Sequence, residues 1–139
     1  MILIDTNVLL DVATDDPVWA EWSQEQLDLA ALRDRLAINP VVYAEFSSRF
    51  RRIEDLDAML ASVGIAVAEI PRSALFLAGQ VFKMYRSRGG PRTSILPDFF
   101  IGAQAAVLGA KLITRDARRY KAYFPAIKLI TPDHRSPSS

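Results

Sequence analysis

The sequence predicts an α/β fold, a three-layer αβα sandwich with helices on both faces of a parallel, roughly five-stranded sheet. Two observations lead to this fold class. Short apolar segments, several of them rich in β-branched residues, alternate along the chain with longer amphipathic segments. The 139 residues, half of them hydrophobic, suffice for one core, and no linker or repeat divides them. We expect one domain over residues 1–132 and a flexible polar tail over residues 133–139.

Five short apolar segments are predicted to be strands. Polar, glycine or proline residues border most of them, as is typical of buried strands in an α/β sheet. In chain order, the predicted strands cover residues 2–4, 37–38, 65–70, 111–114 and 127–130. Because a predicted helix separates each strand from the next, consecutive strands are expected to run parallel.

The segments between the strands are predicted to be helices. Thr6 and Asn7 are expected to cap the first helix. Asn39-Pro40 supplies a cap and a favourable first residue for the third helix, and Gly64 ends the fourth. After a first helix that includes Val8-Leu9-Leu10, the predicted helices cover residues 17–36, 40–50, 54–63, 71–88, 98–108 and 118–124, with a loop at 89–96.

The composition argues against several kinds of site. The chain has no cysteine, which rules out disulfide bonds, a thiolate metal site and a cysteine nucleophile. Its only histidine, His134, lies in the polar tail, which argues against a histidine-based ribonuclease mechanism. The N-terminus lacks the basic start and long apolar stretch of a signal peptide, and no apolar run is long enough to span a membrane. We therefore expect a soluble, cytoplasmic protein.

Charge is divided unevenly between the two halves of the chain. Residues 1–70 contain 5 Lys or Arg and 13 Asp or Glu, whereas residues 71–139 contain 12 and 3. An acidic half joined to a basic half is typical of a cation site beside a surface that binds a polyanion such as nucleic acid. The alternative is ordinary solvated charge that is unevenly distributed, and the charge pattern alone does not decide between the two.

Four acidic residues occupy positions from which their carboxylates can meet. Asp5 and Asp116 follow predicted strands, and ligands of an open α/β sheet bind at the carboxyl ends of its strands. Asp98 lies in the first turn of a helix, and Glu45 lies within a helix among apolar neighbours. Carboxylates brought together repel one another unless a divalent cation such as Mg²⁺ neutralises them. A water bound to that cation is acidic enough to attack a phosphodiester.

Each acid also has a purely structural interpretation. Asp5 can act as a helix cap, Asp98 as a partner of the helix dipole and Asp116 as a turn residue. Glu45 can pair with Arg49, which lies one helical turn away. For a single residue the structural interpretation is the better one, but the joint placement of all four favours a common site.

Four segments of the chain form an ordered set of motifs. They are Ile4-Asp5-Thr6-Asn7, Glu45 after Asn39-Pro40, Leu96-Pro97-Asp98, and Leu112-Ile113-Thr114-Arg115-Asp116 followed by Arg118-Arg119-Tyr120. With these motifs the chain resembles the PIN-domain family, and within it the VapC-type toxin ribonucleases of bacterial toxin–antitoxin pairs. The resemblance runs from Met1 to about Pro132. The Asp-Thr-Asn opening is a weak signal alone, whereas all four segments in order are a specific one.

The resemblance implies a PIN-like nuclease domain that hydrolyses RNA with a water activated by Mg²⁺, for which Mn²⁺ would substitute. Asp5, Glu45, Asp98 and Asp116 would be the catalytic, metal-binding quartet. Toxins of this family usually form homodimers, are inhibited by a cognate antitoxin and bind operator DNA through that antitoxin. The resemblance therefore implies an endoribonuclease toxin with RNA as substrate and these partners, and no membrane.

Further residues receive supporting roles. The resemblance implies that Thr6, Asn7 and Thr114 support the quartet, with Asn7 and Thr114 orienting it or the bound water by hydrogen bonds. Four arginines are candidate RNA contacts. Three flank the glycine-containing loop before Asp98, and the fourth stands at a position where members of the family vary. A solvated basic loop is the alternative for the first three. The four are Arg86, Arg88, Arg92 and Arg115.

Aromatic residues on the predicted helices raise the question of a dimer surface. Packing in the core is the expectation for most of them. Some of them are alternatively part of a groove for a partner, because exposed apolar patches mark interfaces. These residues are Trp19, Trp22, Phe76, Phe82 and Tyr85.

Two other functions compete with the nuclease. A non-catalytic PIN-like module would keep the fold and bind protein or RNA, but the presence of all four acids argues against it. A phosphoryl-transfer enzyme would use Asp5 as nucleophile and usually needs a second aspartate two residues on. Asn7 occupies that position, so this function ranks last.

Overall fold

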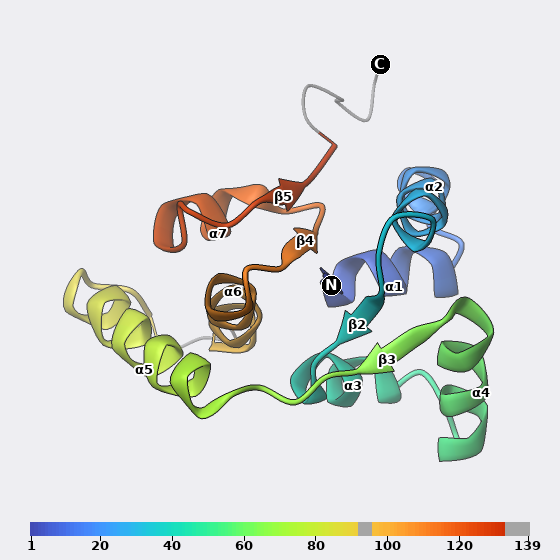
Figure 1. The fold of residues 1–139 in the computed structure, drawn as a ribbon, viewed down its shortest axis with the longest axis horizontal. Coiled ribbons are helices and arrows are strands. Elements are labelled where there is room, and N and C mark those ends of the chain that lie inside the picture. The colour runs from blue at the N-terminus through green and yellow to red at the C-terminus, as the bar shows by residue number, and fades with distance from the viewer. Residues whose placement is uncertain (92–95, 133–139) are drawn as a thin grey trace.

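A computed structural model describes residues 1–91 and 96–132 and confirms the predicted fold class. All strand pairs are parallel, and the five strands lie in the order β3-β2-β1-β4-β5 (Figure 1). The strands are β1 (Ile2–Ile4), β2 (Leu36–Ile38), β3 (Ile65–Val67), β4 (Lys111–Ile113) and β5 (Leu129–Ile130). The predicted tail and Arg92 lie outside the described residues.

Seven helices are described around this sheet. They are α1 (Thr6–Ala13), α2 (Ala20–Ala31), α3 (Pro40–Ser47), α4 (Ile53–Val63), α5 (Arg72–Ser87), α6 (Leu96–Leu108) and α7 (Ala117–Tyr123). Figure 1 shows α1 to α4 around the end of the sheet that carries β2 and β3, and α5 to α7 around the end that carries β4 and β5. None of the described helices is long and apolar enough to cross a membrane.

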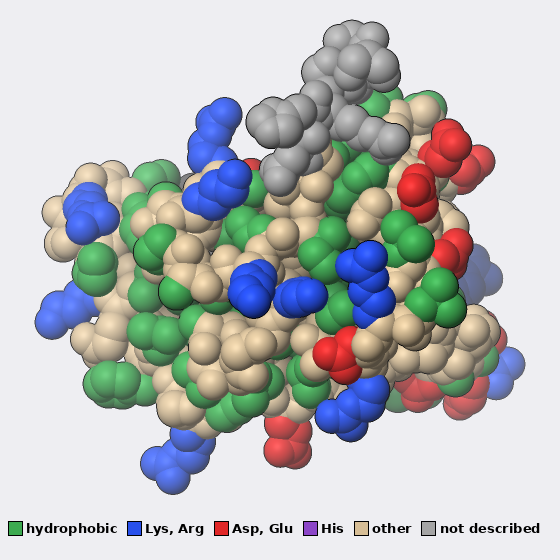
Figure 2. Space-filling model, turned by 45° about the horizontal axis from the view of Figure 1, so that its top comes forward, with side chains coloured by type: hydrophobic (Ala, Val, Ile, Leu, Met, Phe, Trp, Pro, Cys, Tyr) green, Lys and Arg blue, Asp and Glu red, His purple; other side chains and the backbone are tan. Residues whose placement is uncertain are grey.

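The acidic and basic halves of the sequence form the two sides of the sheet. The strands of residues 1–70 are β1, β2 and β3, and the chain then crosses to β4 and β5 on the other side of β1. Figure 2 shows Lys and Arg mainly over the left and centre of one face, on the side of α5 and α7, with most Asp and Glu on the right. The strand order therefore reverses between β1 and β4, which is where open α/β sheets bind ligands.

The strands form the centre of a continuous core. Every residue of β1 and β2 is buried, as expected for parallel strands covered on both faces. Helices contribute large side chains to the same core, among them Phe46, Phe99 and Tyr120. Of the aromatic residues considered above, Trp22 is buried, and Trp19, Phe82 and Tyr85 are partly buried. Phe76 is 70% exposed, so it is the one of the five that does not pack in the core.

Several predicted boundaries are wrong, for physical reasons. Thr6 and Asn7 do not cap α1, because Asp5 has the extended backbone of the N-cap and Thr6 is already helical. The helix predicted over 17–36 is shorter, since the Asp16 carboxylate accepts hydrogen bonds from the backbone N–H groups of Val18 and Trp19 before α2 begins. Its last predicted residue belongs to β2.

Pairing partners set the length of the strands. The third strand was predicted to reach residue 70 but ends at Val67, because its neighbour β2 ends at Ile38. One further backbone hydrogen bond follows the paired residues, from the Ala68 N–H to the Ile38 carbonyl. β5 likewise contains two residues instead of four, and both pair with β4. α6 begins two residues before the predicted Asp98.

Gly79→Ala and Gly102→Ala are expected to change stability in opposite directions. A Cβ on Gly79, exposed on α5, would contact nothing within 4 Å. Alanine there should raise the free energy of unfolding by about 0.5–1 kcal/mol, because it restricts the unfolded chain. A Cβ on Gly102 in α6 would lie 2.4 Å from the buried Phe124 ring. Overpacking should lower the free energy of unfolding of Gly102→Ala by about 1–2 kcal/mol.

Urea denaturation of the two variants measures both effects. Equal stability of Gly102→Ala and the natural protein would show that α6 and Phe124 are not packed as described.

Candidate active site

Asp5 lies where β1 ends and α1 begins, inside the molecule. Its side chain is not used to cap α1, although Asp5 is the N-cap residue. Instead its Oδ2 accepts hydrogen bonds from the Thr114 hydroxyl at 2.8 Å and the Tyr120 hydroxyl at 2.9 Å. The Asn7 amide lies 3.4 Å from the same oxygen. No described side chain donates to Oδ1, while a hydrogen bond from the Thr6 backbone also favours the ionised form of this carboxylate.

Burial makes the charge on Asp5 costly. Asp5 is 5% exposed. Burial, and then the negative charge of Asp98, raise its pKa from 3.8 to about 6, although the hydroxyls of Thr114 and Tyr120 partly oppose this. Burial and the charge of Asp5 also raise the pKa of Tyr120, so its hydroxyl remains a donor. A carboxyl group whose pKa is shifted by burial and by a nearby like charge is typical of a functional site.

Thr114 links Asp5, in the acidic half of the chain (residues 1–70), to Asp116 in the basic half (residues 71–139). It follows β4, which pairs with β1 over its whole length. The buried Thr114 hydroxyl donates to Asp5 and accepts the backbone N–H of Asp116 at 3.1 Å. Asp116 is the exposed N-cap of α7, and its side chain makes no capping hydrogen bond. The Asp116 carboxylate is therefore free to face solvent beside Asp5.

Asp98 enters the site from the first turn of α6 and meets an arginine there. Its Oδ2 forms a short ion pair with Nη1 of Arg119. Burial raises the pKa of Asp98, Arg119 opposes this, and the nearby charges of Glu45 and Asp116 raise it further. These mutual influences place the carboxylates of Asp5, Asp98, Glu45 and Asp116 in one electrostatic group.

Glu45 completes the acidic group from α3. It is exposed, and its Oε1 accepts a hydrogen bond from the Thr6 hydroxyl at 2.8 Å. The alternative pairing of Glu45 with Arg49 is not found among the ion pairs of residues 1–91 and 96–132. Thr6, in the first turn of α1, thus orients Glu45 toward the side of the site that Asp5 occupies.

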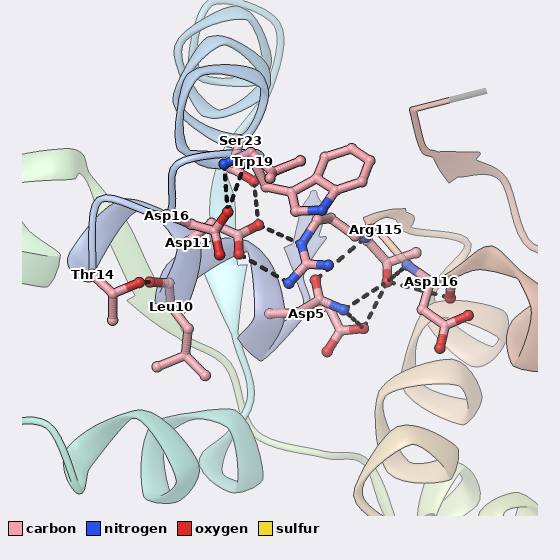
Figure 3. Close-up of polar contacts among 12 residues, drawn as sticks. Asp5, Leu10, Asp11, Thr14, Asp16, Trp19, Ser23, Arg115 and Asp116 are labelled. Atoms are coloured by element: carbon pink, nitrogen blue, oxygen red, sulfur yellow. Dashed lines mark hydrogen bonds and ion pairs between the residues drawn. The ribbon is translucent and has the colours of Figure 1, made fainter. Parts of the chain in front are cut away.

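A second polar cluster holds the segment between Thr114 and Asp116 against the first two helices. Arg115 donates from Nε and Nη2 to the buried Asp11 carboxylate at 2.5 and 3.0 Å. Figure 3 shows its side chain reaching from the turn beside Asp116 toward Asp11 and Trp19. The guanidinium carbon lies 5.3 Å from the Trp19 ring centroid, and Asp11 also accepts from the Ser23 hydroxyl at 2.8 Å. Asp11 therefore holds this guanidinium, although the Arg115 side chain remains 28% exposed.

Two further candidate arginines, Arg86 and Arg88, lie within the described residues. Arg86 and Arg88 are exposed at the C-terminal end of α5 and beyond it. Nη1 of Arg86 donates to the Gly90 carbonyl at 2.8 Å. In the part of the chain that is described, no ion pair joins either arginine to the acidic group.

Three residues of the site were not predicted, although their spacing gave a signal. Arg119 and Tyr120 follow Asp116 by three and four residues, so the first turn of α7 brings them to its side. Asp11 follows Asn7 by four residues on α1, and both contact Arg115, since the Asn7 Oδ1 accepts the Arg115 backbone N–H at 3.3 Å.

Comparison with known proteins shows the family of this chain. The family model of the PIN domain matches residues 2–125. The chain belongs to the PIN domain family. PIN domains are generally nucleases that use divalent metals, so the family and the acidic group agree. No curated protein matches the sequence.

Solved structures with the same PIN fold cover almost the whole chain. A chain of VapBC2 from Rickettsia felis, bound to a promoter DNA fragment, has 22% identity and a TM-score of 0.72 over 96% of this chain and 100% of that one. For VapBC-1 from nontypeable Haemophilus influenzae the values are 19%, 0.69, 94% and 98%. For a toxin-antitoxin complex from Klebsiella pneumoniae they are 21%, 0.63, 95% and 98%. At these identities the likeness concerns the fold.

The donor chemistry of this PIN domain fits a divalent cation. All four acids offer carboxylate oxygens, which Mg²⁺ and Mn²⁺ prefer, and Asp5 keeps one oxygen free of side-chain donors. Within residues 1–91 and 96–132, no three acidic or histidine side chains stand close enough to surround an ion directly. Mg²⁺ usually keeps several waters and few direct protein ligands. Acids too far apart to surround the ion directly can therefore still bind it through water.

Proposed function

We propose that this protein is a divalent-metal-dependent endoribonuclease, the toxin of a toxin–antitoxin pair. The observation that carries the proposal is the group of four carboxylates at the carboxyl ends of β1 and β4. Burial, and then the negative charge of Asp98, raise the pKa of Asp5 to about 6, which supports a site where the protein does not fully compensate a carboxylate charge. A bound cation would supply that compensation.

Each residue of the group has a defined task in this proposal. Asp5, Asp98 and Asp116 would hold Mg²⁺ or Mn²⁺ directly or through water, and Glu45 would be the fourth acid. Such an ion supplies an acidified water as nucleophile and offsets charge on the phosphate. Thr114 and Tyr120 hold one oxygen of Asp5 and thereby aim the other.

Supporting residues fix the positions of the acids. Thr6 holds Glu45 through its hydroxyl. Asn7 lies within 3.4 Å of both Asp5 and Thr114 and accepts the backbone N–H of Arg115. These three side chains, two from α1 and one just after β4, therefore couple the two halves of the site, which is the role proposed for Thr6, Asn7 and Thr114.

Toxin function and its partners rest on the structural neighbours. Those proteins are described as VapBC or toxin-antitoxin complexes, one of them with promoter DNA. We extend this to a cognate antitoxin for the present chain, to operator DNA contacted through that antitoxin, and to a homodimer. We also propose a cytoplasmic location, because an RNA substrate would be found there.

Cleavage of RNA with controlled metal content tests the function. Purified protein should produce discrete new RNA ends in Mg²⁺ or Mn²⁺ and none with EDTA. Asp116→Asn should remove the ends, whereas Glu25→Gln, on the exposed face of α2, should leave them unchanged. RNA binding without cleavage by the natural protein would contradict the proposal and favour the non-catalytic PIN module.

Arg119→Gln should tighten binding of Mn²⁺. In the described structure Arg119 neutralises Asp98, so a cation must compete with its guanidinium for this carboxylate. Because both side chains are partly exposed, we expect an affinity gain of about fivefold, measured by calorimetry. Arg118→Gln, which removes the same charge one residue away without breaking a described ion pair, is the control. Equal affinities for the two variants would contradict direct competition.

A further inference from the structure

A hollow beside the acidic group has walls of aromatic and basic side chains. It lies between α5 and α7 and has a volume of about 370 Å³, within the range of roughly 300–1,000 Å³ typical of small-ligand sites. Asp116, at the start of α7, belongs both to the hollow and to the acidic group. The other lining residues are Tyr85, Arg118, Arg119, Ala122 and Tyr123.

The two tyrosines are held in fixed positions. Their ring centroids lie 5.9 Å apart at an interplanar angle of 73°. Both rings also pack against the buried ring of Phe99, with centroid distances of 5.6 Å for Tyr85 and 5.2 Å for Tyr123. Both remain only partly buried, so they offer preformed aromatic surface to a ligand.

The backbone after α5 adds to this rigidity. A Cβ on Gly90 would lie 2.5 Å from the Tyr85 ring, so the chain passes this ring at a distance that only glycine permits. The hydrogen bond from Arg86 to the Gly90 carbonyl holds the backbone there. The tyrosine wall is thus fixed without a ligand, and a ligand would bind without the entropic cost of ordering it.

The two arginines that line the hollow differ in how their charge is compensated. Arg118 is exposed and, within residues 1–91 and 96–132, forms no ion pair, whereas Arg119 is paired with Asp98. An exposed guanidinium beside two aromatic rings matches a nucleotide, which combines a phosphate anion with a flat base. A phosphate and an acidic side chain are both anions, but only a nucleotide also brings a flat base to the two tyrosine rings, so a nucleotide fits this hollow better than an acidic peptide.

We propose that this hollow binds one unpaired nucleotide of the RNA substrate, adjacent to the scissile phosphate. Its base would lie against Tyr85 and Tyr123, and its phosphate would contact Arg118. The proposal rests on the proposed function, because it assigns the hollow to the same RNA. A base can reach these rings only when it is unpaired, so the substrate would be single-stranded at this position.

Fluorescence anisotropy of a labelled, mixed-sequence single-stranded RNA, in EDTA to prevent cleavage, tests the proposal. Tyr123→Leu should weaken binding about tenfold, the effect of losing one stacked base. Arg118→Gln should weaken binding and lower the slope of log affinity against log salt by about 0.7. The matched controls are Phe76→Leu and Arg72→Gln on α5, which should bind as the natural protein does.

A second measurement stays informative if Tyr123→Leu folds poorly. The natural protein is crosslinked by near-ultraviolet light to RNA that contains 4-thiouridine, and the modified peptides are identified by mass spectrometry. Crosslinks on Tyr85 or Tyr123 are expected. Crosslinks confined to other helices, or unchanged affinity and salt slope in both folded variants, would overturn the proposal.

The outcomes separate this inference from the proposed function. Metal-dependent cleavage by the natural protein, with binding unaffected in the variants, would refute the nucleotide site alone. An absence of both RNA binding and cleavage would refute both proposals. Unchanged RNA binding, together with loss of binding to a poly-glutamate peptide in Arg118→Gln, would assign the hollow to a protein partner instead.

Discussion

Asp5→Asn is expected to abolish RNA cleavage and, at the same time, to stabilise the metal-free protein above pH 6. Loss of cleavage follows because the amide cannot supply the negative charge that a cation requires. The gain in stability follows because asparagine has nearly the shape of a protonated aspartate. Its carbonyl oxygen can still accept hydrogen bonds from Thr114 and Tyr120, which now hold Oδ2 of Asp5.

The direction of the stability change follows from the pKa of Asp5. The unfolded chain releases this proton near pH 3.8, whereas the folded protein retains it until about pH 6. Between these values the folded state binds more protons, so the free energy of unfolding falls as the pH rises. Above pH 6 the loss is complete and amounts to at most about 3 kcal/mol, because one pKa unit corresponds to about 1.4 kcal/mol. Asp5→Asn avoids this loss.

Thermal unfolding in EDTA at pH 5 and pH 8 measures the effect, and Asp16 supplies a control of opposite sign. Hydrogen bonds from the backbone of Trp19 and Val18 lower the pKa of Asp16, so its ionised form favours the folded state above the unfolded pKa. Asp16→Asn should therefore destabilise the protein at pH 8. A lower melting temperature of Asp5→Asn at pH 8, with cleavage retained, would contradict the account of Asp5.

Arg115→Met is expected to be the most destabilising single change near the site. It leaves the Asp11 carboxylate, whose side chain is 3% exposed, without its bidentate partner. Removing one member of a buried pair typically costs about 3–5 kcal/mol, and the partial exposure of Arg115 places this case near the lower limit. Urea denaturation measures the loss.

A double variant distinguishes the ion pair from simple loss of packing. Asp11→Leu with Arg115→Met removes both charges, so it should be clearly more stable than Arg115→Met alone. Cleavage should fall in both, because Arg115 anchors the turn that positions Thr114 and Asp116. If the double variant loses the sum of the two single effects, the Asp11–Arg115 pair does not hold this turn.

The sequence predicted the fold class and the type of every described element, because strands and helices of this fold have distinct hydrophobic patterns. It did not predict where strands end, since Val67 ends β3 only because β2 offers no further partner. It also named four acids as a site, and in the structure the charges of Asp5, Glu45 and Asp116 act on or are acted on by that of Asp98, while their shared role stays a prediction. It did not predict that Asp98 pairs with Arg119, or that Tyr120 donates to Asp5 across 115 residues, because such pairs depend on tertiary packing.

The contacts of the Arg115 side chain could not be predicted from the sequence either. From the sequence it is a candidate phosphate contact. The structure places its guanidinium against Asp11 on α1 and Trp19 just before α2, both more than ninety residues earlier in the chain. Local motifs identify which residue types are present, whereas partners distant in the chain decide what an individual side chain does.

Binding of Mn²⁺ measured by electron paramagnetic resonance at pH 7.5 tests the central claim most directly, since Asp5 is ionised at that pH. The protein should bind Mn²⁺, and each of Asp5→Asn, Glu45→Gln, Asp98→Asn and Asp116→Asn should weaken that binding by about tenfold or more, as is typical of a lost charged contact. Glu25→Gln should bind as the natural protein does. Unchanged affinity in the four variants, or no binding by the natural protein, would contradict a shared metal site.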